Sequence, residues 1–256
     1  MRKRMITQIL VGLVLAALLP ALASAVEPSE GKIRVLLITG GHGFDQEPFF
    51  EVFASFPDID TKHVPYPDAA KLLGPDLAKT CDVVVFYDMW NKGFTDEQKA
   101  AFVQLLEKGI GVVAMHHTLA AHGNWPEYQS IIGGRYHTRE RVVDGKKLPK
   151  STFSHGETLS VTIADTEHPI TRGMKDFAIH DETYFNYDTD PRARVLLTTD
   201  HPKNDPELAW VREYGRSRVF YLMLGHDHDA YENPNFRLLV ARGIRWAAKR
   251  ATEPES

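Results

Sequence analysis

Short apolar runs recur along the first half of the chain and predict its strands. Residues 33–39, 83–87 and 111–115 are almost continuously apolar and rich in branched side chains, a pattern typical of strands that are buried on both faces. A further strand is expected near residues 59–64. The first half of the chain is therefore expected to contribute four strands to one sheet.

Segments with helical spacing lie between these strands. We expect the first helix to begin with Pro48 at its first position, where proline is favoured, because phenylalanines follow it at near-helical intervals. Thr95 and Gln98 match a capping box and predict the start of a second helix, which ends before Gly109. Strands that alternate with helices predict a parallel sheet with helices on both faces, the doubly wound class of α/β fold.

The second half of the chain changes to closely spaced strands. Its strand candidates are residues 158–164, 194–199, 208–214 and 218–224. Because turn residues separate them at short intervals, we expect a mixed or antiparallel extension of the sheet. Asn233 and Pro234 open a final amphipathic helix. The sequence between the two halves has no linker-like composition, so a single domain over residues 26–256 is expected.

Residues 1–25 have the three parts of a secretory signal peptide. Residues 1–4 carry three positive charges, residues 9–19 are apolar, and Ala23-Ser24-Ala25 supplies a cleavage site. We therefore expect a mature protein that is exported to the periplasm or the extracellular space. No other run reaches the roughly 18 apolar residues of a membrane span, so no membrane attachment is expected after cleavage.

Composition and charge narrow the class of protein further. The 256 residues are 43% hydrophobic and 25% charged, which excludes a disordered or fibrous chain. Removal of a leader with three cations and no acid changes the formal charge from −4 to about −7, so a nucleic-acid partner is not expected. Cys81 is the single cysteine, which excludes an intramolecular disulfide. It opens a strand, so we do not expect a catalytic thiol.

Polar side chains directly follow the predicted parallel strands. Ligands of open parallel sheets bind outside the carboxyl ends of the strands. The residues at these positions are His42, Asp45, Asp88, His116, His117, His226, Asp227 and His228. We expect four strand ends to bring this set into one imidazole-rich pocket, although any single member could instead cap a helix or face solvent.

A second polar cluster lies outside these strand ends. It comprises residues 180–184, with the sequence HDETY, together with His122, Arg135 and His137. Histidine and carboxylate groups suit a divalent metal ion, although no HExxH, paired-cysteine or EF-hand spacing specifies one. The same groups can act as general acid and base without a metal. Gln46 interrupts a dinucleotide fingerprint, and motifs for a P-loop or a serine elbow are missing from the sequence.

The chain resembles the ThuA-like (trehalose utilisation) family. The matching segments, in order, are VLLITGGHGFD, GVVAMHHTLAAHGNWPEYQSIIGGRYH, HPITRGM, DETYF, PELAWVREYGRSRVFYLMLGHD and FRLLVARGIRWAA, and they cover nearly the whole mature chain. Because this family is similar to class I glutamine amidotransferases, the resemblance implies a flavodoxin-like sheet with helices on both faces. The amidotransferases carry a cysteine in the tight turn after the central strand. Here that turn is Met115-His116-His117, so the resemblance does not extend to amide hydrolysis.

The resemblance implies a role in carbohydrate metabolism with a small carbohydrate as substrate. Exported members look like parts of systems that degrade oxidised (3-keto) glycosides. The positions that match the family motifs are His42, His116, His117, His137, Asp181, Glu182 and His226. A reaction at a keto-sugar needs a base beside the carbonyl and a donor or cation that holds the enediolate oxygen. We expect Glu182 and His117 to be catalytic; the candidate metal ligands are His116, His137 and His226.

The alternative is a sugar-binding or assembly protein without catalysis. Several aromatic residues lie near the predicted pocket, namely Trp90, Trp125, Tyr128, Tyr136 and Tyr184. Each could stack on a sugar ring or simply pack in the core. The expected substrate contacts are His42, Asp45, Asp181, Trp125 and Tyr184. A pocket with at least five histidine or carboxylate groups favours proton transfer or metal chemistry over binding alone. No motif predicts an oligomeric state.

Overall fold

Five parallel strands form one half of a nine-stranded sheet within residues 31–252, the part of the chain that this computed structural model describes. They are β1 (Ile33–Gly40), β2 (Ile59–Pro65), β3 (Val83–Asp88), β4 (Gly111–Met115) and β13 (Ser217–Leu222). Their order in the sheet is β2-β1-β3-β4-β13. Every residue of β3 and β4 is buried, as their continuous apolar runs predict.

Four antiparallel strands extend the sheet beyond β13. In spatial order they are β12 (Glu207–Tyr214), β11 (Arg194–Thr198), β8 (Thr152–Ile163) and β9 (Phe177–Phe185). The expected mixed second half is therefore confirmed. Strand β8 begins at Thr152, earlier than the predicted residue 158. Strand β9 was not predicted, because its central residues are polar although most of them are buried.

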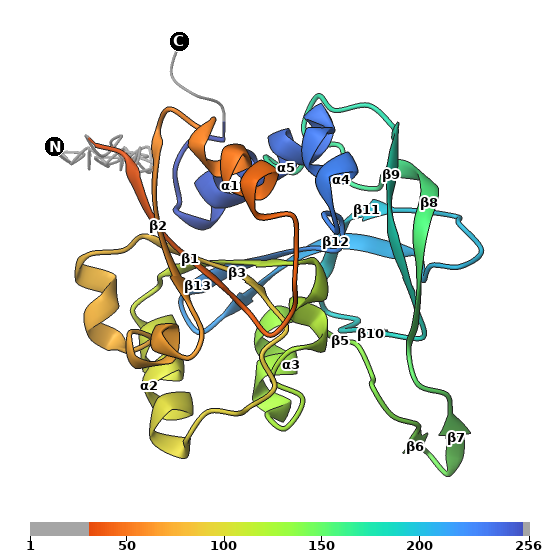
Figure 1. Ribbon diagram of the computed structural model, residues 1–256, viewed down its shortest axis with the longest axis horizontal. Coiled ribbons are helices and arrows are strands. Elements are labelled where there is room, and N and C mark those ends of the chain that lie inside the picture. Colours follow the sequence, from red (N-terminus) through yellow and green to blue (C-terminus); the bar gives the residue numbers. More distant parts are fainter. Residues whose placement is uncertain (1–30, 253–256) are drawn as a thin grey trace, which may run out of the picture.

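Helices cover both faces of the sheet, as expected for a doubly wound fold. They are α1 (Gln46–Ala54), α2 (Asp96–Glu107), α3 (Pro126–Ile132), α4 (His228–Glu232) and α5 (Pro234–Ala247). Figure 1 shows α1, α4 and α5 over one face and α2 and α3 over the other. This arrangement buries the apolar residues of the parallel strands on both sides.

The helix starts test the sequence signals directly. The capping box before α2 is confirmed: the Thr95 hydroxyl accepts from the Gln98 N–H at 3.2 Å, and the Gln98 side chain accepts from the Thr95 N–H at 3.0 Å. Asn233 caps α5 as expected. Pro48 is the third residue of α1 rather than its first, because Asp45 occupies the position before the helix.

Short elements connect the sheet and its helices. They are the 3-10 helices η1 (Asp68–Lys71), η2 (Pro75–Lys79) and η3 (His116–Ala120), the strand pair β5 (Gly134–Arg135) and β10 (Asp188–Thr189), and the hairpin β6 (Arg141–Val143) and β7 (Lys146–Leu148). The hairpin projects from the body of the molecule in Figure 1. Within the described residues, no helix is long and apolar enough to cross a membrane.

The parallel half determines where a site can form. Gly40 pairs with Asp88 at the ends of β1 and β3, and Met115 pairs with Leu222 at the ends of β4 and β13. The loops after these four strands therefore emerge at the same edge of the sheet. The first loop needs glycine at position 41, where φ is 85° and a Cβ would lie 2.4 Å from the Met89 carbonyl oxygen.

Candidate functional site

His116 occupies a strained turn directly after β4. Its φ of 49° lies in the left-handed region, which residues other than glycine rarely adopt. The Tyr221 hydroxyl donates to the His116 carbonyl at 2.9 Å and holds the turn. The imidazole is completely buried, and its Nδ1 lies 2.6 Å from the Met223 carbonyl oxygen. Since a carbonyl only accepts, Nδ1 carries a hydrogen and Nε2 is left to face the site.

Strand β9 brings Glu182 to this turn. Its Oε2 lies 3.0 Å from His116 Nε2 and 3.3 Å from His226 Nδ1, and its Oε1 lies 3.2 Å from His155 Nδ1. The Tyr184 hydroxyl lies 2.9 Å from the same His116 Nε2. Burial raises the pKa of Glu182, but hydrogen bonds and charge from His116 and His226 outweigh it and hold the pKa well below its usual range. Glu182 is therefore a carboxylate at neutral pH.

Asp181 fixes the loop that carries His226. Its carboxylate accepts from the backbone N–H groups of Gly225 at 2.7 Å, His226 at 3.0 Å and Glu182 at 2.8 Å. Burial raises the pKa of Asp181, although these bonds and the His116 charge oppose the rise. Burial alone would lower the pKa of His226, but its bond to Glu182 raises it. Asp181 thus ties the His226 loop to β9.

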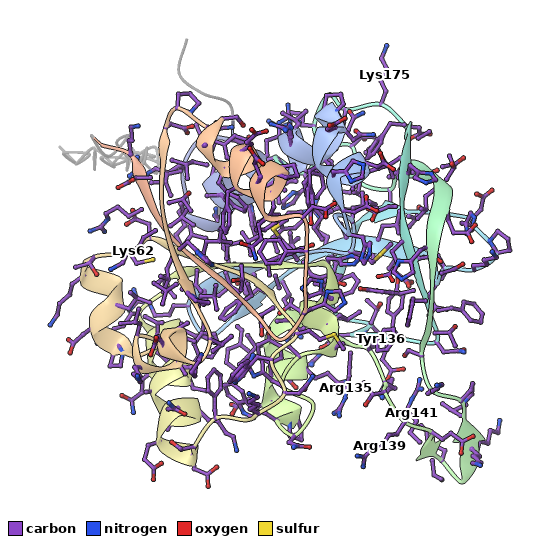
Figure 2. All side chains as sticks on the ribbon, in the orientation of Figure 1. Lys62, Arg135, Tyr136, Arg139, Arg141 and Lys175 are labelled. Carbon is purple, nitrogen blue, oxygen red and sulfur yellow. The ribbon has the colours of Figure 1, made fainter. Side chains whose placement is uncertain are left out.

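A cavity of about 290 Å³ opens beside this group. It is lined by His42, Met89, His117, Ala120, Tyr136, Thr138, Lys150, Ser151, Phe153, His155, Glu182, Tyr184 and His226. Tyr136 directly follows β5. In Figure 2 it lies on the side of the molecule from which the chain continues, through Arg139 and Arg141, to the β6–β7 hairpin. This volume is close to the lower end of the range for ligand pockets, which begins at about 300 Å³. The cavity lining therefore combines aromatic faces with titratable groups.

Comparison with known proteins assigns the family. The family model for ThuA, described as trehalose utilisation, matches residues 34–247. The chain belongs to the ThuA family. This membership connects the protein with carbohydrate metabolism, as the resemblance implied. No curated protein matches the sequence.

Solved structures with the same fold include other ThuA-like proteins. The ThuA-like protein of Parabacteroides merdae has 22% identity and a TM-score of 0.70, and the match covers 88% of this chain and 93% of that one. That of Bacteroides uniformis has 18% identity and a TM-score of 0.63, with 86% and 93% covered. A Salmonella typhimurium protein named as cytoplasmic has 14% identity and a TM-score of 0.58, with 84% and 99% covered. These likenesses establish the ThuA-like fold for this chain.

His42 and His117 line the cavity of this ThuA protein. The His117 ring centroid lies 4.8 Å from that of His42 and 4.4 Å from that of Tyr87. Within the described residues neither ring nitrogen of His117 has a hydrogen-bond partner, and burial lowers the pKa of this imidazole well below its usual value. We expected His117 to be the partner of Glu182. The structure corrects this expectation, because the left-handed turn brings His116 to the carboxylate instead.

His137 lies away from the group that contains Glu182. Its Nε2 lies 2.6 Å from Asp188 Oδ2, and the other oxygen of Asp188 accepts from Arg141 at 2.7 Å. The pairing of β5 with β10 places Asp188 opposite Arg135 and so beside His137. The expectation that His137 joins His116 and His226 is therefore wrong. The sequence offers no signal for so short a strand pair.

Other predicted residues serve the fold around the cavity. Asp45 lies outside the lining and contacts His228 Nδ1 at 2.9 Å. Trp125 is buried among core aromatic residues and does not line this cavity, so the structure does not place it where the substrate contact was expected. Asp181, also expected to touch substrate, binds backbone groups instead. Asp88 accepts a hydrogen bond from the Thr118 hydroxyl in η3 at 2.7 Å, and Asp227 caps α4. Their bonds are thus satisfied within the protein.

His155 was missed by the sequence analysis. It lies on β8, where the register with β9 shifts between Ser154 and Glu157. This irregularity brings the imidazole to Glu182 Oε1 and its ring to 4.6 Å from the His226 ring. Its side chain is 57% exposed, in contrast to the buried His116. The sequence signal is only a histidine before a glycine in a polar strand.

Proposed function

We propose that this ThuA-family protein is an exported enzyme that moves protons on a sugar or glycoside, in particular one that carries a ketone. The observation that supports this function best is the carboxylate of Glu182, which contacts His116, His155 and His226 at the wall of the cavity. Three imidazoles around one carboxylate exceed what sugar binding alone requires. Perturbed titratable groups in a cavity are typical of proton transfer.

The residues of the cavity match the needs of such a reaction. A base takes the proton from the hydroxyl-bearing carbon beside the ketone. The C–H electron pair forms a C=C bond, and the π pair of the ketone moves onto its oxygen to give an enediolate. Glu182 is ionised and can take that proton directly or through His155. His226, whose pKa the carboxylate raises, donates to the developing oxyanion. Tyr136 and Phe153 offer aromatic faces to the sugar ring.

Glu182→Gln tests this function. The variant keeps the shape of the side chain and removes the base, so turnover of a responsive glycoside or 3-keto-glycoside should fall by about 100-fold or more while binding of that sugar persists. Turnover and equilibrium binding are measured on the same sample. The matched control is Glu157→Gln. Glu157 lies on β8, the strand paired with β9, but it contacts Lys203 and His201 and does not line the cavity.

Two results would contradict the proposal. Unchanged turnover in a folded Glu182→Gln protein would remove Glu182 from the chemistry. Tight sugar binding by the wild-type protein without conversion of any glycoside or 3-keto-glycoside would instead indicate a sugar-binding module.

A further inference from the structure

We propose that His116, Glu182 and His226 bind one divalent transition-metal ion, with Zn²⁺ or Mn²⁺ as the fitting class. This inference rests on the proposed function for the location of the site, but its evidence is the arrangement of three ligand atoms. Two imidazole nitrogens and one carboxylate oxygen are a set that such ions take in proteins. All three residues are buried or half-buried, and Glu182 and His226 also line the cavity.

The distances within the set fit one shared ion. His116 Nε2, His226 Nδ1 and Glu182 Oε2 form a triangle with sides of 3.0, 3.1 and 3.3 Å. Two ligand atoms that are each about 2.1 Å from one ion lie about 3.0 Å apart at a right angle and about 3.4 Å apart at the tetrahedral angle. The three sides fall within this range. The spacing of the three atoms is therefore compatible with one shared ion.

The hydrogen bonds of these side chains are compatible with a cation. Because His116 Nδ1 donates to the Met223 carbonyl, the neutral form of the ring has its lone pair at Nε2, toward Glu182 and His226. In the protein without an ion, the Tyr184 hydroxyl can donate to this lone pair, and His226 Nδ1 can donate to Glu182 Oε2. A divalent ion would replace these two hydrogens and contact the same three ligand atoms.

Neighbouring groups hold these side chains in place. Metal-ligating histidines usually donate their second ring N–H to a carbonyl or carboxylate, as His116 does to Met223. Asp181 fixes the backbone N–H of His226, and His155 contacts Glu182 through Oε1, which leaves Oε2 for the ion. The surroundings thus match those of a ligand set rather than of a chance cluster.

The proposed ion changes the assignment of roles. When bound, it supplies a Lewis acid for a carbonyl or hydroxyl oxygen of the sugar. Glu182 then acts as a ligand, and His155 remains as the exposed imidazole at the cavity that can take or give a proton.

Metal titration tests the site without reference to turnover. Untagged full-length protein is dialysed against chelator and titrated calorimetrically with Zn²⁺, Mn²⁺ and, as a hard-ion control, Ca²⁺. We expect one Zn²⁺ or Mn²⁺ per chain and far weaker Ca²⁺ binding. His226→Ala should weaken Zn²⁺ binding by about 100-fold or more, because it removes a ligand. His228→Ala is the matched control, since His228 is exposed and contacts Asp45 and Asp229.

Thermal unfolding gives a second measurement in case a variant is poorly folded. Zn²⁺ should raise the melting temperature of the wild type and of His228→Ala but not that of His226→Ala. Equal Zn²⁺ affinity in all three proteins, or no stoichiometric binding by the wild type, would overturn the metal site. Turnover that persists without metal would leave the proposed function standing alone. Zn²⁺ binding without turnover of any sugar would leave the metal site standing and refute the enzyme.

Discussion

At the scale of single residues, backbone conformation decides which histidine serves the site. His116 and His117 are adjacent, but only His116 has the left-handed φ that presents its ring to β9. Such a conformation costs about 1–3 kcal/mol and persists where surrounding contacts impose it. Tyr221 and Met223 provide those contacts through the carbonyl and Nδ1 of His116. The turn that the sequence resemblance matches to the amidotransferase cysteine turn presents an imidazole here.

Cys81 gives a prediction at the same scale. Its Sγ donates to the Val83 carbonyl at 3.1 Å, and burial raises the pKa of the thiol to about 11. The thiol is therefore protonated at neutral pH and lies away from the cavity lining. Cys81→Ser should keep full turnover and lower the free energy of unfolding by roughly 1–3 kcal/mol, as measured by urea denaturation. Loss of turnover in a folded variant would restore a thiol mechanism.

At the scale of secondary-structure elements, a strand was predictable from the sequence where its burial requires apolar residues. The parallel strands were predictable because β3 and β4 are buried on both faces and are therefore continuously apolar. Strand β9 was not predictable, because several of its buried residues are polar and form hydrogen bonds with other elements, as Asp181 does with the His226 loop. The strand-end rule correctly brought His116 and His226 together.

The remaining misplacements arise from pairings that local sequence does not encode. His137 was misplaced because β10 brings Asp188 to it. His155 was missed because its contact with Glu182 depends on a register shift within β8 and β9. Register and short bridging strands depend on the assembled sheet, so periodicity in one segment does not reveal them.

Asp181 allows a test of how β9 positions the His226 loop. Asp181→Asn replaces a carboxylate that accepts three backbone N–H bonds by an amide with one accepting oxygen. We expect the free energy of unfolding to fall by about 1–3 kcal/mol in urea denaturation, because a buried N–H loses its acceptor. Asp176→Asn is the matched control, since Asp176 precedes β9 and accepts one bond, from Ile163. Equal losses in both variants would refute the special role of Asp181.

At the scale of the whole molecule, the proposed export concerns a segment outside the described residues. Residues 1–25 have the charged, apolar and small-residue parts of a leader in the required order. Protein recovered from the native host's envelope or medium should begin at or near Val26, as measured by intact mass. Recovery of the chain with Met1 still attached, from the cytoplasm alone, would contradict export.

His168 gives a final prediction, which concerns the pH dependence of overall stability. It lies on the connection between β8 and β9, where its Nδ1 accepts from the Ile170 N–H at 3.2 Å and its ring packs 5.2 Å from Trp246 of α5. Burial is the larger cause and the charge of Arg194 the smaller one, and together they lower the pKa of His168 from 6.5 to about 4. A protonated ring would also lose its accepting nitrogen.

The sign of the effect follows from the two pKa values. Below pH 6.5 the unfolded chain binds a proton at His168 that the folded protein excludes until about pH 4, so the contribution to stability is complete above pH 6.5 and declines as the pH falls toward 4. His168→Asn keeps an accepting oxygen for Ile170 but cannot titrate. Denaturation at several pH values should therefore show the wild type losing about 3 kcal/mol more than His168→Asn between pH 7 and pH 4. Parallel pH profiles for the two proteins would contradict the lowered pKa, because the variant differs from the wild type in this one titrating group.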